Sequence, residues 1–197
     1  MKCSIVDIHT HRPTGKALEP SFAGIHPWQA ETRRIEEIVP RFGEVDLVGE
    51  IGLDYAGTVG REAQLRIFRE QLDWAERLGK PVVLHCVKAF EAVMRELAPH
   101  ALRAVIFHGF IGSSQQAAEA IKKGYYLSFG ERTFRSPRTV EALRRTPVEN
   151  LFAETDESDV PIEEIYRRIA QAKDLDPELL KCAIYRLSLI HISEPTR

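Results

Sequence analysis

The chain has 197 residues, of which 44% are hydrophobic and 28% are charged, enough to bury the core of one compact domain. Its formal net charge of −2 argues against a basic protein that coats duplex DNA, although it does not exclude a nucleic-acid substrate. No apolar run approaches the ~18–20 residues of a membrane span, and no secretory signal is expected at the amino terminus.

The three cysteines, Cys3, Cys86 and Cys182, are odd in number and form no CxxC pair. We therefore expect neither a disulfide framework nor a structural zinc site held by thiolates. A reducing compartment suits this cysteine usage, so the sequence predicts a cytoplasmic location.

Short apolar segments rich in Val, Ile, Leu and aromatic residues recur along the chain, mostly flanked by Gly or Pro, and are predicted as buried strands. They are Ser4–Ile8, Phe22–Ile25, Leu47–Ile51, Val82–Leu84, Ala104–Phe107, Tyr125–Phe129 and Leu151–Ala153. Between some of them, apolar residues at spacings of three and four predict amphipathic helices. These helices run over residues 61–78, from 113 or 114 to 123, and from about 161 to 173.

Strands that alternate with helices predict parallel strands joined by crossover helices, in either an open doubly wound sheet or a closed (β/α) barrel. Seven strands are visible where a full barrel has eight, and the chain falls just short of the ~200 residues of the smallest such barrels. We expect an α/β protein with a trimmed or distorted (β/α) TIM-type barrel, formed by residues 1–186 as one domain.

The last residues, 187–197, break this pattern. Their sequence, LSLIHISEPTR, resembles translated sequencing-adapter sequence. We therefore expect a non-native tail and a native chain that is truncated near Arg186; the alternative is a genuine final strand.

Nearly every predicted strand ends in a side chain that can bind a metal ion. The carboxyl ends of parallel barrel strands meet at one edge, so residues far apart in sequence converge there. His9 and His11 are two residues apart in an extended segment and therefore share a face. The candidates are Asp7, His9, His11, His26, Glu50, Asp54, His85, His108, Glu154 and Asp156.

Imidazole and carboxylate ligands suit zinc, manganese, iron or magnesium. A single tetrahedral zinc would leave part of this set unused, whereas two ions that share a bridging carboxylate would use about six ligands, four histidines and two acids. A hydrogen-bonded structural role explains any one such histidine well, but it explains the whole set poorly.

Six motifs stand in a fixed order along the chain. They are DIHTH (Asp7–His11), GIHPW (Gly24–Trp28), GEIGLDY (Gly49–Tyr55), PVVLHC (Pro81–Cys86), FHGF (Phe107–Phe110) and ETD (Glu154–Asp156). In this order they resemble the TatD family of metal-dependent deoxyribonucleases, over about residues 4–186. The chain departs from the family pattern in three ways: it lacks the second strand–helix unit, its residues after ETD differ, and its C-terminal helix is truncated. The first two departures bear on substrate shape more than on metal binding.

The resemblance implies two divalent ions, with Mg, Mn and Zn as the candidates. The ligands it implies are His9, His11, Glu50, His85, His108 and Asp156. His9, His11 and Asp156 would hold one ion, and His85 and His108 the other. Glu50 would bridge the ions, and Asp156 would also orient or deprotonate the attacking water.

Five further residues are expected beside the ligands or on the substrate side. They are His26, Asp54, Lys88, Trp28 and Tyr55. Lys88 follows the fourth predicted strand, and we expect it to contact a phosphate. Trp28 and Tyr55 either stack on a nucleobase or pack within the protein.

The sequence therefore predicts a metal-dependent hydrolase, a TatD-like deoxyribonuclease that cleaves phosphodiester bonds with water activated by two ions. DNA that is single-stranded or accessible at an end is the expected substrate, with no membrane and no obligate protein partner. One alternative is an amidohydrolase-type enzyme that cleaves a C–N or ester bond of a small molecule, although Glu50 stands where a carbamylated lysine would bridge. A second alternative is a non-catalytic metal-binding fragment, which the complete set of predicted ligands disfavours.

Overall fold

The computed structural model describes residues 3–193, which divide into two compact units. The middle unit comprises residues 21–107, and the split unit comprises residues 3–20 together with 108–193. None of the described helices is long and apolar enough to cross a bilayer. The single domain predicted for residues 1–186 stays a prediction.

The middle unit contains four parallel strands that pair in chain order. They are β1 (Phe22–Ala23), β2 (Leu47–Asp54), β3 (Val82–Val87) and β4 (Val105–Phe107). All eight residues of β2 are buried, as expected of a strand covered on both faces. Its register with β3 shifts between Val48 and Ile51, which marks a β-bulge.

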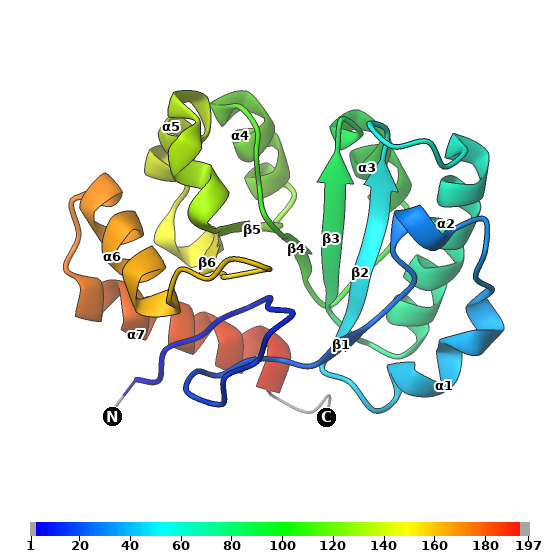
Figure 1. Cartoon of the computed structure of the whole chain (residues 1–197), viewed down its shortest axis with the longest axis horizontal. Coiled ribbons are helices and arrows are strands. Elements are labelled where there is room, and N and C mark those ends of the chain that lie inside the picture. Colours follow the sequence, from blue (N-terminus) through cyan, green and yellow to red (C-terminus); the bar gives the residue numbers. More distant parts are fainter. Residues whose placement is uncertain (1–2, 194–197) are drawn as a thin grey trace. The chain divides into compact units, whose positions relative to one another are not determined.

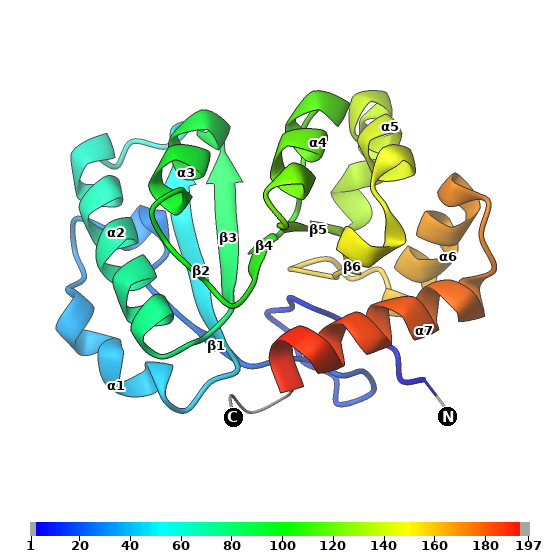
Figure 2. The same cartoon turned by 180° about the vertical axis from the view of Figure 1, so that it is seen from behind.

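Helices cover these strands. They are η1 (Pro27–Gln29), η2 (Ile35–Glu37), α1 (Val39–Phe42), α2 (Arg61–Arg77) and α3 (Phe90–Leu97). Figure 1 shows α2 and α3 beside β2 and β3, and Figure 2 shows the same pair of helices from behind. α2 confirms the predicted helix over residues 61–78, and Phe68, Leu72 and Ala75 of its apolar stripe are fully buried.

Two buried glutamines connect α2 to the backbone at the carboxyl ends of β1 and β2. Gln71 accepts the backbone N–H of Ile25 at 2.6 Å and donates to the Ile25 carbonyl at 3.1 Å. Gln64 makes the same two-sided contact with Asp54, at 2.7 and 2.9 Å. A helix that is otherwise apolar on this face thus fixes the backbone at Asp54 and beside His26.

The split unit contains the parallel pair β5 (Tyr126–Phe129) and β6 (Leu151–Ala153). Its helices are α4 (Ser114–Lys122), η3 (Glu131–Arg135), α5 (Pro137–Arg145), η4 (Val148–Asn150), α6 (Ile162–Lys173), α7 (Pro177–Ser188) and η5 (Leu189–Ser193). Ser113 caps α4 by accepting the Gln116 N–H, which confirms the predicted helix start. α6 begins and ends within a residue of its predicted bounds.

Two sequence predictions are wrong in this unit. Ser4–Ile8 forms no ladder strand; it is held by an isolated bridge between Val6 and Leu18 and by single backbone hydrogen bonds. Cys3 and Cys182 form a disulfide, with Cα atoms 5.1 Å apart across 179 residues of sequence. Because cysteine spacing says nothing about such a distant pairing, the pattern could not reveal it. The cytoplasmic location, which rested on the same cysteine argument, stays a prediction.

The predicted tail begins inside a helix. Leu187 and Ser188 are buried at the end of α7, and His191 Nε2 lies 2.7 Å from the Tyr126 hydroxyl. Residues 194–197 lie outside the described residues. The non-native origin of 187–197 stays a prediction.

Candidate metal centre

Backbone hydrogen bonds in the split unit fasten the segment with the two histidines to the segment after β6. Ile8 N–H donates to the Ala153 carbonyl at 3.0 Å, and Asp156 N–H donates to the His9 carbonyl at 3.0 Å. His11 N–H donates to the Asp156 carbonyl at 3.1 Å. This pairing, which includes a parallel bridge between Thr10 and Asp156, holds His9 and His11 beside the Asp156 carboxylate.

Asp7 reinforces that pairing from within. Its carboxylate is buried and accepts the Thr155 backbone N–H at 3.0 Å and the Thr155 hydroxyl at 2.6 Å. Burial raises the pKa of Asp7 from 3.8 to about 7, and the hydrogen bonds from Thr155 oppose that rise. Since Thr155 stands between Glu154 and Asp156, Asp7 holds the residue that links two candidate ligands.

The first group of donor atoms comprises His9, His11 and Asp156. The Nε2 atoms of His9 and His11 lie 3.9 and 3.7 Å from Asp156 Oδ1. His9 is buried, whereas His11 is exposed. Asp156, the residue that forms the bridge to Thr10, has a φ of 56°, a left-handed conformation that aspartate tolerates better than most residues.

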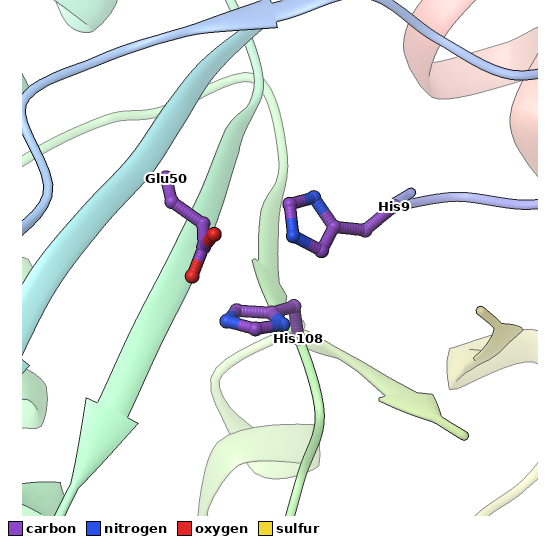
Figure 3. Close-up of side chains that lie close together, drawn as sticks. All are labelled: His9, Glu50 and His108. Atoms are coloured by element: carbon purple, nitrogen blue, oxygen red, sulfur yellow. The ribbon is translucent and has the colours of Figure 1, made fainter. Parts of the chain in front are cut away.

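His108 and Glu154 extend this group. The His9 and His108 rings lie 4.5 Å apart (Figure 3), and His108 Nδ1 lies 3.5 Å from Glu154 Oε1. Glu50, which is also labelled in Figure 3, belongs to β2 of the middle unit. Glu154 Oε2 is buried and has no hydrogen-bond partner within residues 3–193.

The second group lies in the middle unit, where the bulge in β2 turns Glu50 toward His85 of β3. His85 Nδ1 lies 3.2 Å from Glu50 Oε2, and His85 Nε2 lies 3.2 Å from Asp54 Oδ2. The close approach of the strands here requires glycine: a Cβ on Gly52, whose φ is 136°, would lie 2.1 Å from the His85 carbonyl oxygen.

Asp54 is itself firmly held. Oδ2 accepts the Trp28 indole N–H at 2.8 Å, and Oδ1 accepts the Ala56 backbone N–H at 2.9 Å. Burial raises the pKa of Asp54, but the hydrogen bonds from Trp28, Ala56 and His85 outweigh it and hold the pKa below its usual value. A carboxylate that accepts the Nε2 proton of His85 leaves Nδ1 as an electron-pair donor on the Glu50 side.

His26 faces the same carboxylate, with Nε2 3.7 Å from Glu50 Oε2. Its Nδ1 accepts the Trp28 backbone N–H at 3.2 Å, so the ring proton of neutral His26 lies on Nε2. This tautomer directs a donor, not an electron pair, at Glu50. The expectation that His26 lies beside the ligands stays a prediction.

The remaining predicted residues lie at strand ends of the middle unit. Lys88 is exposed just after β3, with a left-handed φ of 51°. Trp28 is 62% exposed. Tyr55 follows β2 and has the Arg61 guanidinium 4.4 Å above its ring.

The donor sets fit divalent cations. Each group offers imidazole nitrogens and carboxylate oxygens that lie within 4.8 Å of one another. The groups are His9–His11–Asp156, His108–Glu154–Asp156 and His26–Glu50–His85. In the last group the Nε2 proton of His26 is directed at Glu50, so Glu50 and His85 supply the electron pairs. The unpartnered Glu154 Oε2 supports this fit, because a buried carboxylate oxygen without a hydrogen bond is costly unless a cation balances it.

Sequence reasoning included Glu154 among the strand-end acids but not among the ligands. The feature that could have indicated a ligand role is the position of Glu154 directly after β6, since His108 likewise follows β4 directly. The bridging role of Glu50 and the pairing of His85 with His108 each join residues of different units, so both stay predictions.

The chain matches the profile of the family described as TatD related DNase over residues 16–188. It is 33% identical over 157 residues to the uncharacterized metal-dependent hydrolase YjjV of Escherichia coli, a match that covers 73% of this chain and 61% of that protein. It is also 33% identical over 149 residues to the 3'-5' ssDNA/RNA exonuclease TatD of Citrobacter koseri, covering 69% and 56%.

The crystal structure of the E. coli YjjV protein, a TatD homolog, is similar to this structure with a TM-score of 0.80 and 24% identity. The likeness covers 90% of this chain and 78% of that one, and it confirms the predicted α/β barrel class, with six strands rather than seven within the described residues. The chain spans 56–61% of the length of the two curated relatives. With a family match that extends over most of its length, the chain belongs to the TatD-related DNase family.

Proposed function

We propose that the chain is a metal-dependent hydrolase that cleaves phosphodiester bonds in DNA. The observation that carries the proposal is the gathering of imidazole and carboxylate donors at strand ends in each unit of a TatD-family chain. The names of relatives add the substrate class: one is a 3'-5' ssDNA/RNA exonuclease. Single-stranded or end-accessible DNA is therefore the substrate to test first.

In this proposal His9, His11 and Asp156 hold one divalent ion in the split unit, with His108 and Glu154 beside them. Glu50 and His85 hold a second ion in the middle unit, and Mg, Mn and Zn are the candidates. Such ions, when bound, lower the pKa of coordinated water and neutralise charge on a phosphoryl group.

The chain's own residues supply proton transfer and orientation. Asp156 is half-buried, and its Oδ1 lies between two imidazoles, so it is placed to accept a proton from the attacking water. The water oxygen bonds to phosphorus, the bond from phosphorus to the leaving oxygen breaks, and that oxygen takes up a proton from solvent water. Asp54 orients His85, and the exposed Lys88 ammonium contacts a substrate phosphate.

The experiment is cleavage of end-labelled single-stranded DNA by purified chain with added Mg, Mn or Zn. Asp156→Asn and His11→Ala should each lower kcat by at least 100-fold, on the order of the effect of removing a general base or an electrostatic stabiliser. His100→Ala is the matched control, because His100 pairs with Glu76 at 2.7 Å and belongs to none of the donor groups.

A panel of lactones and cyclic amides run under the same conditions tests the alternative hydrolase. Turnover of a small amide or lactone with inert DNA would overturn the proposal. Equal activity of Asp156→Asn and the unmodified chain would overturn the assigned role of Asp156.

A further inference from the structure

Trp28 is the exposed aromatic side chain of the described residues: every other Phe, Tyr and Trp between residues 3 and 193 is at least partly buried. Its residue remains 62% exposed although an indole ring normally buries a large apolar area. A fully mobile tryptophan on a surface would need no explanation, but this one is fixed in place.

The Nε1 edge of the indole is the anchored part. Nε1–H donates to Asp54 Oδ2 at 2.8 Å, and this edge faces Gly57, where an added Cβ would lie 3.8 Å from Nε1. The backbone is fixed as well, because Trp28 N–H donates to His26 Nδ1 at the start of η1, whose first residue, Pro27, is buried. The ring is thus held in one orientation while most of its surface faces solvent.

The ring lies directly at the donor group of the middle unit. Trp28, Asp54 and His85 form a hydrogen-bonded series, and the Trp28 and His85 rings lie 6.0 Å apart. The His26 ring lies 4.5 Å from the indole, in an edge-on arrangement. An apolar, pre-oriented surface therefore borders the group that holds Glu50.

We infer that Trp28 is a stacking platform for a nucleobase of the substrate, next to the phosphate that the middle-unit donor group serves. The inference rests on the proposed function. An aromatic ring held in advance binds a base face at little cost in side-chain entropy, and stacking tolerates any base. Tyr55 is the weaker candidate, since Arg61 already covers one face of its ring.

Two variants separate stacking from the hydrogen bond to Asp54. Trp28→Phe and Trp28→Leu both remove the indole N–H, but only phenylalanine retains an aromatic face. On oligodeoxythymidine, the KM of Trp28→Leu should exceed that of Trp28→Phe by roughly tenfold, in line with the measured strength of base stacking. On an abasic oligonucleotide of the same length the difference should vanish.

A binding measurement needs no cleavage. The chain has two tryptophans, so Trp74→Phe leaves Trp28 as the single reporter; Trp74 lies on α2 beside Arg77 and takes no part in the site. Phosphorothioate oligodeoxythymidine should quench its fluorescence more strongly than the abasic oligonucleotide does at equal occupancy. Equal quenching, or equal KM values for the Phe and Leu variants, would overturn the stacking role. Absence of DNA cleavage by the unmodified chain would instead overturn the proposed function.

Discussion

Replacing Thr155 with valine tests whether the contact between Asp7 and Thr155 stabilises the pairing that carries His9, His11 and Asp156. Valine matches the shape of threonine but removes the hydroxyl that donates to Asp7 Oδ2 at 2.6 Å. The backbone N–H of residue 155 still donates to the other carboxylate oxygen, so Asp7 loses one of its two hydrogen bonds from Thr155. The substitution also removes the contact between the Thr155 and Thr10 hydroxyls at 3.0 Å.

The expected cost follows from the burial of Asp7, whose exposed fraction is 3%. A hydrogen bond to a charged group contributes about 1.5–3 kcal/mol, and a buried acceptor that loses its donor retains the desolvation penalty. We expect Thr155→Val to lower the free energy of unfolding by about 2 kcal/mol. Thr155→Ser keeps the hydroxyl and loses one half-buried methyl group, which costs under ~1 kcal/mol.

The assay is urea unfolding at pH 8.5 in chelator, where Asp7 is ionised because its pKa is about 7. The same two variants are titrated with Mn²⁺, and the valine variant should bind it more weakly than the serine variant does. A double-mutant cycle with Asp7→Asn isolates the pair. Equal stability of the valine and serine variants, or no coupling in the cycle, would refute the reasoning.

Three further outcomes are expected. The pKa of Asp7 is raised from 3.8 to about 7, so between these pH values the folded chain retains a proton that the unfolded chain has lost. In chelator, the free energy of unfolding should therefore fall by about 4 kcal/mol between about pH 4 and pH 7, relative to that of Asp7→Asn. Parallel pH profiles of the two proteins would contradict this. Thiol titration should find one slow thiol in the non-reduced folded chain, because Cys3 and Cys182 are joined and burial raises the pKa of Cys86 to about 12; three fast thiols without reductant would contradict the disulfide. Gly52→Ala should abolish folding or lower the free energy of unfolding by more than about 3 kcal/mol, because the added Cβ would lie 2.1 Å from the His85 carbonyl oxygen. A near-native melting midpoint would contradict this and show that β2 and β3 can separate locally.

Hydrophobic pattern predicted where strands begin better than where they end. The predicted strands Leu47–Ile51 and Val82–Leu84 start correctly, but β2 and β3 continue to Asp54 and Val87. Their last rungs pair Gly52 with His85 and Asp54 with Val87, so the ladder runs on through polar residues. A hydrophobic pattern does not predict these strand pairs, because the backbone pairing there positions metal-binding side chains rather than filling the core.

The first segment shows the opposite error. Ser4–Ile8 is apolar enough to be a strand, yet its backbone partners among the described residues are only Leu18, through one isolated bridge, and Ala153, through one hydrogen bond. Ladder length depends on partners distant in sequence, which composition does not reveal. The same limit hid the disulfide.

At the site, residue type and position at strand ends predicted the donors, since parallel strands bring their carboxyl ends to one edge. The pattern did not predict the buried polar residues that hold the donor-bearing segments in place. Gln64 and Gln71 look like ordinary helix residues, yet each binds the backbone of a donor-bearing segment. Asp7 was predicted only as one of the strand-end candidates, and its partner, Thr155, emerges only from the fold.

The central claim is that the donor groups bind divalent cations, and metal binding by the purified chain tests it most directly. Calorimetric titration of chelator-treated protein with Mn²⁺ or Zn²⁺, beside Asp156→Ala and His100→Ala, should show binding that the first variant weakens by tenfold or more and the second leaves unchanged. A chain that takes up neither ion, with a melting midpoint that neither ion shifts, would contradict the account.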